Sequence, residues 1–116
     1  MFVQGFLVPV PGARRADYER GARQMAALFR EHGALRVVEG WAEGLPWGEA
    51  TSFPRAVAAV EDEAVVFGWM EFADRAACDA CIAAVMADPR ARAGMEDPPY
   101  DMARMVFGGF DAVVQA

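Results

Sequence analysis

The stretch AVVFGWMEFADRAACDACIAAVM, residues 64–86, decides the fold, because its pattern is that of a strand followed directly by a helix. Large apolar side chains occupy both alternating faces of its first nine residues, which predicts a strand over 64–72. Asp74 is a typical helix N-cap, and apolar residues then recur at the spacing of three and four that one buried helix face requires. They are Cys78, Cys81, Ile82 and Val85. We therefore expect a helix that ends near Met86.

The N-terminal part of the chain has the same order. FVQGFLVPV, residues 2–10, predicts a strand that ends at prolines, which cannot continue a hydrogen-bonded ladder. Residues 14–31 predict a helix, and Gly33 is a suitable residue to end it. Its apolar stripe consists of Tyr18, Ala22, Met25, Ala26 and Phe29. The two halves thus each begin with a strand–helix unit.

Three further strands are expected, at residues 35–42, 53–60 and 102–114. A loop rich in glycine and proline covers 43–52, the acidic residues 61–63 predict a solvated hairpin tip, and Asp88-Pro89 predicts a short helical turn. This order predicts an α+β, ferredoxin-like β-α-β-β-α-β fold, with an antiparallel sheet and two helices on one face. The extra strand is either 53–60 or an extension of the last. We expect residues 1–116 to form one domain.

Composition indicates a protein that pairs with a second copy of itself. The chain has 116 residues, of which 55% are hydrophobic, and most expected strands carry large apolar groups on both faces. A sheet covered by helices on one side needs only one apolar face, so the surplus predicts a homodimer. The net charge of −6 disfavours nucleic acid and anionic membranes as partners. With no basic leader segment and no apolar run of membrane-spanning length, we expect a cytoplasmic protein.

Five segments in order resemble one known family. They are GFLVPVP (5–11), REHGAL (30–35), TSFPRAV (51–57), VMADPR (85–90) and RMVFGGF (104–110). Together they resemble the small bacterial YbaA-like proteins, a family of unknown function. The resemblance implies the fold of the dimeric α/β-barrel superfamily, in which two ferredoxin-like sheets pack face to face. It implies no catalytic residue and no cofactor.

The two cysteines form a lone CxxC motif at Cys78 and Cys81. In redox motifs the first sulfur lies at a helix N-terminus, whereas Cys78 lies about one turn inside the expected helix, on its apolar face. A zinc site would need further ligands, and the chain has a single histidine. We interpret both cysteines as core residues and expect no metal.

Three residues are candidates for catalysis: His32, Glu39 and Arg55. His32 ends the first helix, where it serves either as a general base at a pocket rim or, as we favour, as a partner for free helix carbonyls. The alternation of apolar residues around Glu39 and Arg55 predicts that these two charges meet across adjacent strands. Gln4, Trp69 and Glu71 are expected on the same face, toward the partner. The pair is either an ion pair that fixes the dimer register, which we favour, or the polar end of a ligand cavity.

Candidates for ligand binding lie mainly in two loops and the strands beside them. They are Trp47, Ser52, Trp69, Tyr100, Asp101 and Arg104. These loops offer aromatic walls and polar groups on a rigid scaffold, and they serve equally well to hold a partner subunit. Glycines in the strands, Gly5 and Gly68 among them, leave room for a close approach, and a bulge is expected at Gly108-Gly109.

These features support three hypotheses about function. The first is a homodimer that binds or transforms a small apolar molecule between sheet and helices, without a cofactor. The alternative is a non-catalytic structural or protein-interaction dimer, and the least favoured is an RNA-associated protein. Only fold analogy indicates an enzyme, and fold alone does not establish an activity.

Overall fold

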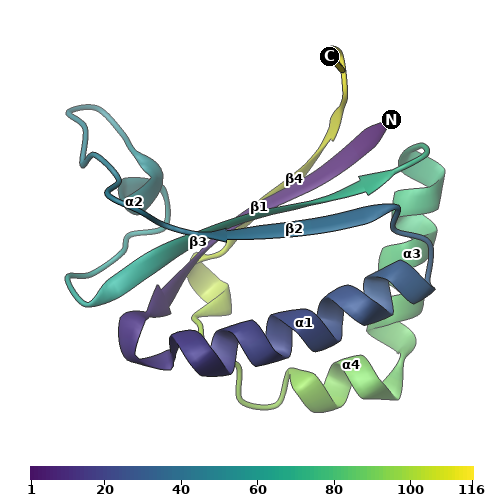
Figure 1. Cartoon of the computed structure of the whole chain (residues 1–116), viewed down its shortest axis with the longest axis horizontal. Helices are drawn as coiled ribbons and strands as arrows, with labels where there is room; N and C mark the ends of the chain where they lie inside the picture. Colours follow the sequence, from purple (N-terminus) through teal and green to yellow (C-terminus); the bar gives the residue numbers. More distant parts are fainter.

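Four strands form one antiparallel sheet in the spatial order β2-β3-β1-β4 (Figure 1), in the computed structural model of residues 1–116. The strands are β1 (Phe2–Pro11), β2 (Arg36–Trp41), β3 (Glu63–Phe72) and β4 (Val106–Asp111). The long strands β1 and β3 are central and pair along their whole length, from Phe2 opposite Phe72 to Pro11 opposite Glu63. This order, with helices after β1 and β3, confirms the predicted ferredoxin-like fold.

Helices cover one face of this sheet, and a short fourth helix lies beyond the other face (Figure 1). The covering helices are α1 (Arg15–Glu31) and α3 (Arg75–Ala87), with α4 (Pro89–Gly94) packed against both on the same side, and the fourth is α2 (Phe53–Ala56). Two short 3-10 turns complete the chain, at Gly12–Arg14 and Met102–Arg104. The predicted caps are confirmed, because Asp74 accepts a hydrogen bond from the Ala77 amide at 2.8 Å and Asp88 accepts one from the Arg90 amide at 2.9 Å.

The strand predicted at 53–60 is wrong. Ser52 accepts a hydrogen bond from the Arg55 amide at 3.2 Å, and a proline follows in the first turn, so this segment begins a helix. Ala58 then takes a positive φ of 49°, which turns the chain toward β3. The last strand is also shorter than the predicted 102–114, because Asp101 caps a 3-10 turn that precedes β4.

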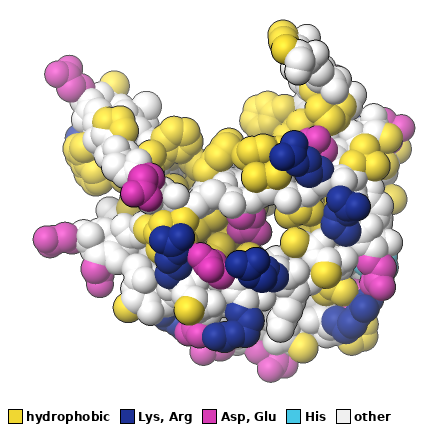
Figure 2. Space-filling view, viewed as in Figure 1, with side chains coloured by type: hydrophobic (Ala, Val, Ile, Leu, Met, Phe, Trp, Pro, Cys, Tyr) yellow, Lys and Arg dark blue, Asp and Glu magenta, His cyan; other side chains and the backbone are white.

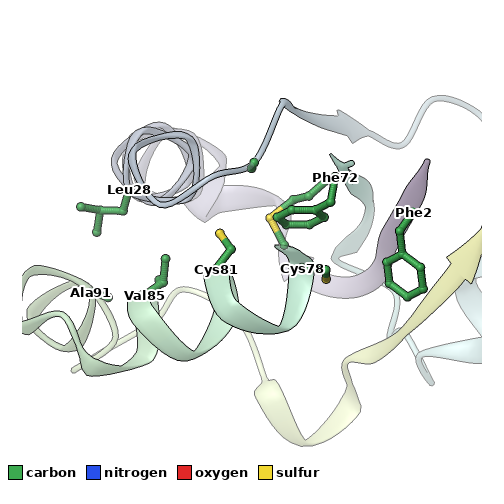
Figure 3. Packing of buried hydrophobic residues seen from close by; sticks show 9 residues of the cluster. Phe2, Leu28, Phe72, Cys78, Cys81, Val85 and Ala91 are labelled. Carbon is green, nitrogen blue, oxygen red and sulfur yellow. The ribbon is translucent and has the colours of Figure 1, made fainter. Parts of the chain in front are cut away.

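The largest core cluster lies between α1, α3 and the sheet (Figure 3). Phe72 is completely buried at its centre, beside Cys78 and Cys81 of α3. Burial raises the pKa of both thiols, and the Cys81 thiol donates a hydrogen bond to the Phe29 carbonyl at 3.4 Å. Both cysteines are free and buried, as predicted for core residues.

The strand glycines make room for aromatic rings rather than for a bulge. A Cβ atom at Gly68 would lie 2.5 Å from the Phe6 ring, and one at Gly109 would lie 2.5 Å from the Phe2 ring. The pairing of β1 with β4 runs without interruption from Phe2 opposite Asp111 to Leu7 opposite Val106. The bulge predicted at Gly108-Gly109 is therefore absent.

The face of the sheet opposite α1, α3 and α4 is apolar, and we call it the open sheet face. Alternation along the strands places mainly apolar residues on it, among them Val3, Leu7, Val38, Phe67, Trp69, Val106 and Phe110. Residues 42–62, which connect β2 to β3 and contain α2, form what we call the α2 arm. The space-filling view shows hydrophobic side chains gathered in the notch between the α2 arm and the C-terminal residues that follow β4 (Figure 2). A hollow of about 410 Å³ lies on this face. Its only charged residue, Glu71, accepts a hydrogen bond from the Trp69 indole at 2.9 Å and lies 3.9 Å from Arg36. No helix of the chain has the length and apolar character needed to cross a membrane.

Candidate functional site

A carboxyl group of β2 meets a phenol of α1 in the layer between sheet and helices. Glu39 lies opposite Gly68 in the β2–β3 pairing, on the helix-covered face. The Tyr18 hydroxyl donates a hydrogen bond of 2.5 Å to Glu39 Oε1. A charged residue on this face needs a polar partner, and Tyr18 supplies it from the apolar stripe of α1.

Aromatic rings hold Tyr18 in place. Its ring packs edge-on against Trp41 at 6.3 Å and against Tyr100 at 5.8 Å between centroids. The Arg15 guanidinium lies over the Trp41 ring, 5.0 Å from its centroid. Tyr18 itself is buried, so its hydroxyl is fixed toward Glu39.

Glu39 lines a cleft of about 300 Å³ between α1 and β2. The residues that line it are Glu19, Arg23, Ala26, Val37 and Glu39. Figure 2 shows a hollow below the edge of the sheet, with basic and acidic side chains alternating beneath it. The Glu39 carboxyl makes no ion pair, and Tyr18 is its only hydrogen-bond partner.

Burial dominates the electrostatics of this site. It raises the pKa of Glu39 above the usual range, although the hydrogen bond from Tyr18 acts in the opposite direction. The pKa of Tyr18 is raised strongly, first by burial and then by the charge of Glu39, and that of Tyr100 is raised for the same two reasons. Tyr18 therefore stays a hydrogen-bond donor at neutral pH, while Glu39 is the group able to take up and release a proton.

Of the predicted site residues, the structure brings Glu39 and Tyr100 together and leaves Arg55 elsewhere. Arg55 donates hydrogen bonds to the carbonyls of Trp47 at 2.9 Å and Gly48 at 3.2 Å, and its guanidinium lies 4.7 Å from the Trp47 ring centroid. The predicted Glu39–Arg55 pair is wrong, because the segment that carries Arg55 is a helix on an arm and not a strand beside β2. In this arm Ser52 serves as the helix cap.

The predicted common face of five polar and aromatic residues is also wrong. Gln4 and Glu39 lie on the helix-covered face, since Gln4 contacts the Cys78 thiol at 3.9 Å and Glu39 contacts Tyr18. Trp69 and Glu71 lie on the open sheet face. The two sets are separated by the thickness of the sheet.

His32 lies at the C-terminal end of α1, as predicted, and its Nε2 is 3.2 Å from Asp88 Oδ2. The Arg90 guanidinium bonds to both Asp88 and Glu31, and its hydrogen bonds are the main reason that the pKa of Asp88 lies below the usual range. Glu31, His32 and Asp88 have ligand atoms close enough for a metal ion, but the guanidinium already uses both carboxylates. This cluster ties α1 to α4.

Asp101 and Arg104 form a second ion cluster. Arg104 bonds to both oxygens of the nearly buried Glu63 at 2.7 Å, to Asp101 at 2.8 Å and to the Ala58 carbonyl at 3.0 Å. Hydrogen bonds from Arg104 are the largest cause that lowers the pKa of both carboxyls. Glu63 is thus part of this network rather than a solvated hairpin tip, and the network fixes the base of the α2 arm.

Reasoning from the sequence missed Tyr18 and Trp41 as members of the site. Tyr18 is the one side chain with a polar tip on the apolar stripe of the first helix. Trp41 follows Glu39 on the same face of its strand. The signal available in the sequence was a carboxyl within an apolar strand, together with one hydroxyl on the apolar stripe of the neighbouring helix.

Comparison with known proteins agrees with the resemblance found in the sequence. Residues 1–102 match the family described as "Protein of unknown function (DUF1428)". The chain is 42% identical over 113 residues to the uncharacterized protein YbaA of Escherichia coli strain K12, and the match covers 97% of each chain. Identity and coverage are the same for YbaA of Shigella flexneri. A solved structure of an uncharacterized NIPSNAP domain protein from Burkholderia xenovorans has the same fold, with a TM-score of 0.64 at 13% identity over 100% of this chain and 98% of that one. The chain therefore belongs to the DUF1428 family, to which its sequence is similar over nearly the whole length.

Proposed function

We propose that the protein binds a small, largely apolar molecule in the cleft between α1 and β2, where Glu39 exchanges a proton with it. One observation carries this proposal: the half-buried Glu39 carboxyl lines the cleft with a single hydrogen bond, from Tyr18, and makes no ion pair. A buried carboxylate that serves stability alone is normally paired with a cation. A carboxyl kept at a cost in stability is more typical of a functional site.

The chemistry of the cleft suits proton transfer without a cofactor. A carboxylate with a raised pKa is a stronger base than an exposed one, and a larger fraction of the group carries the proton that a general acid donates. Tyr18 fixes the orientation of the carboxyl and leaves the second oxygen available to a ligand. The volume is at the lower end of the range of about 300–1,000 Å³ that is common for ligand pockets, which limits the ligand to a small molecule.

We further propose that the protein acts as a homodimer joined through the open sheet face. Large apolar side chains remain exposed there, with Phe67 at 46% and Phe110 at 65%, and the charges on this face are already compensated. An apolar patch of this kind supports a protein interface. A non-catalytic dimer is the alternative if the cleft binds nothing. Two free core thiols suit a reducing compartment, which supports the cytoplasm as the location.

Filling the cleft tests the first proposal. Ala26→Phe extends a ring into the cleft from α1, whereas Ala27→Phe places the same ring on the exposed side of the same helix. A fluorinated fragment library is screened by ¹⁹F NMR, and the hits are mapped by ¹⁵N amide shifts of the wild-type protein. We expect hits that shift amides of residues 19–26 and 37–41, and that are lost in Ala26→Phe but kept in Ala27→Phe. Hits that map elsewhere, or that survive in Ala26→Phe, would contradict the proposal.

A further inference from the structure

Three charged residues of α1 form a row along the mouth of the cleft, at the i, i+4 spacing of neighbours on one helix face. They are Arg15, Glu19 and Arg23. Glu19 accepts a hydrogen bond from Arg15 Nε at 2.9 Å and lies 3.9 Å from Arg23. Glu19 therefore pairs closely with Arg15 and only at longer range with Arg23, and the three residues of the row carry a net charge of +1.

That charge belongs to Arg23. Its guanidinium donates no hydrogen bond within the protein, and its side chain is 79% exposed although it lines the cleft. By contrast, Arg55 and Arg104 use their guanidinium groups to bond protein oxygens. Helix α1 is also locally cationic, with four arginines and three acidic residues, whereas the chain as a whole has 11 basic residues and 17 acidic ones.

The cleft thus offers two polar anchors with an apolar wall between them. Arg23 on α1 presents unused N–H donors, Glu39 on β2 presents an acceptor, and Ala26 and Val37 supply apolar surface. An arginine fork matches a carboxylate, with two parallel hydrogen bonds.

We infer that the ligand of this cleft is a small carboxylic acid with an apolar body, whose carboxylate binds Arg23 and whose hydroxyl or amine donates a hydrogen bond to Glu39. This inference rests on the proposed function, because it names the ligand class of the same cleft. The acidic net charge of the protein repels free anions at long range, so the local cation at Arg23 is what makes an anion acceptable.

The test compares three probes of one shape by ¹⁵N amide shift titration. 4-Hydroxybenzoate has both groups, 4-hydroxybenzamide lacks the negative charge, and benzoate lacks the hydroxyl. We expect 4-hydroxybenzoate to bind about tenfold more tightly than either of the others, in keeping with the strength of a charge-assisted hydrogen bond. Arg23→Gln should remove the preference for carboxylate over amide. Arg20→Gln should keep it, because Arg20 is an exposed arginine of the same helix that pairs with Asp17 and does not line the cleft.

The outcomes separate this inference from the proposed function. Equal binding of carboxylate and amide, or a preference that survives in Arg23→Gln, overturns the inference, and so does the failure of all three probes to bind. In each case the fragment screen with Ala26→Phe still decides whether the cleft is a binding site. Both substituted arginines are exposed, so loss of folding does not confuse the result.

Discussion

Replacing Phe110 with aspartate is expected to weaken the proposed homodimer by about 2 kcal/mol or more, the loss typical of a central interface residue. Phe110 is 65% exposed and lines the hollow on the open sheet face, so in the proposed dimer it is buried against the second copy. A carboxylate there would be desolvated without a cation, close to Glu71, which lines the same hollow. Twofold symmetry makes the substitution act in both subunits.

Phe107 provides the matched control. It lies on the same strand and is 70% exposed, but alternation places it on the opposite face. Sedimentation equilibrium at micromolar concentration should give twice 12.6 kDa for the wild type and for Phe107→Asp, and a lower mass for Phe110→Asp. A monomeric wild type, or a Phe110→Asp variant that pairs as tightly as the wild type, would contradict the proposed interface.

The second large effect is expected at Gly68. In Gly68→Ala the new Cβ atom would lie 2.5 Å from the Phe6 ring and 3.0 Å from Glu39 Cγ, so both side chains must move. Overpacking of this kind costs about 1–3 kcal/mol in the free energy of unfolding. Because Glu39 is one of the two groups displaced, ligand binding in the cleft should weaken as well.

Gly5→Ala is the control, because its Cβ atom would meet only the Gly68 carbonyl oxygen, at 3.8 Å. Urea denaturation of the two variants measures the difference, and Gly5→Ala should stay close to the wild type. If both alanine variants have wild-type stability, the Phe6 ring is not held over Gly68 as described.

Much of the fold was predictable from local signals. The caps at Asp74 and Asp88, the stop at Gly33 and the order of strands and helices all have short-range causes, and each is observed. Residues 53–60 were misread because their apolar pattern resembles a strand. The competing signal, Ser52 followed by Pro54, was stronger, since a capped first turn with proline needs no partner strand.

The candidate site was only half predictable, because its partners come from tertiary structure. The sequence pattern indicates Glu39 as a polar group in an apolar strand, but the partner of Glu39 depends on which elements lie beside that strand. Because residues 53–56 form a helix, Arg55 lies on the α2 arm, away from β2. Tyr18 of α1 is instead the neighbour of Glu39 across the helix–sheet interface. The prediction of which residues share a sheet face failed for a similar reason, since a pattern of alternation does not say which face the helices cover.

The proposed role of Glu39 as the proton-exchanging group depends on the protonation of its carboxyl, which a titration measures directly. The δ-carbon shift of Glu39 is followed by ¹³C NMR against pH in the wild-type protein. We expect a pKa above the ordinary value of a glutamate, because burial without an ion pair disfavours the charged form. Since a raised pKa favours the protonated folded protein, the contribution of Glu39 to stability is full at low pH and is lost as the pH rises through that pKa. A pKa at or below the ordinary value would mean that Glu39 is well solvated or paired, and would contradict its role as the proton-exchanging group.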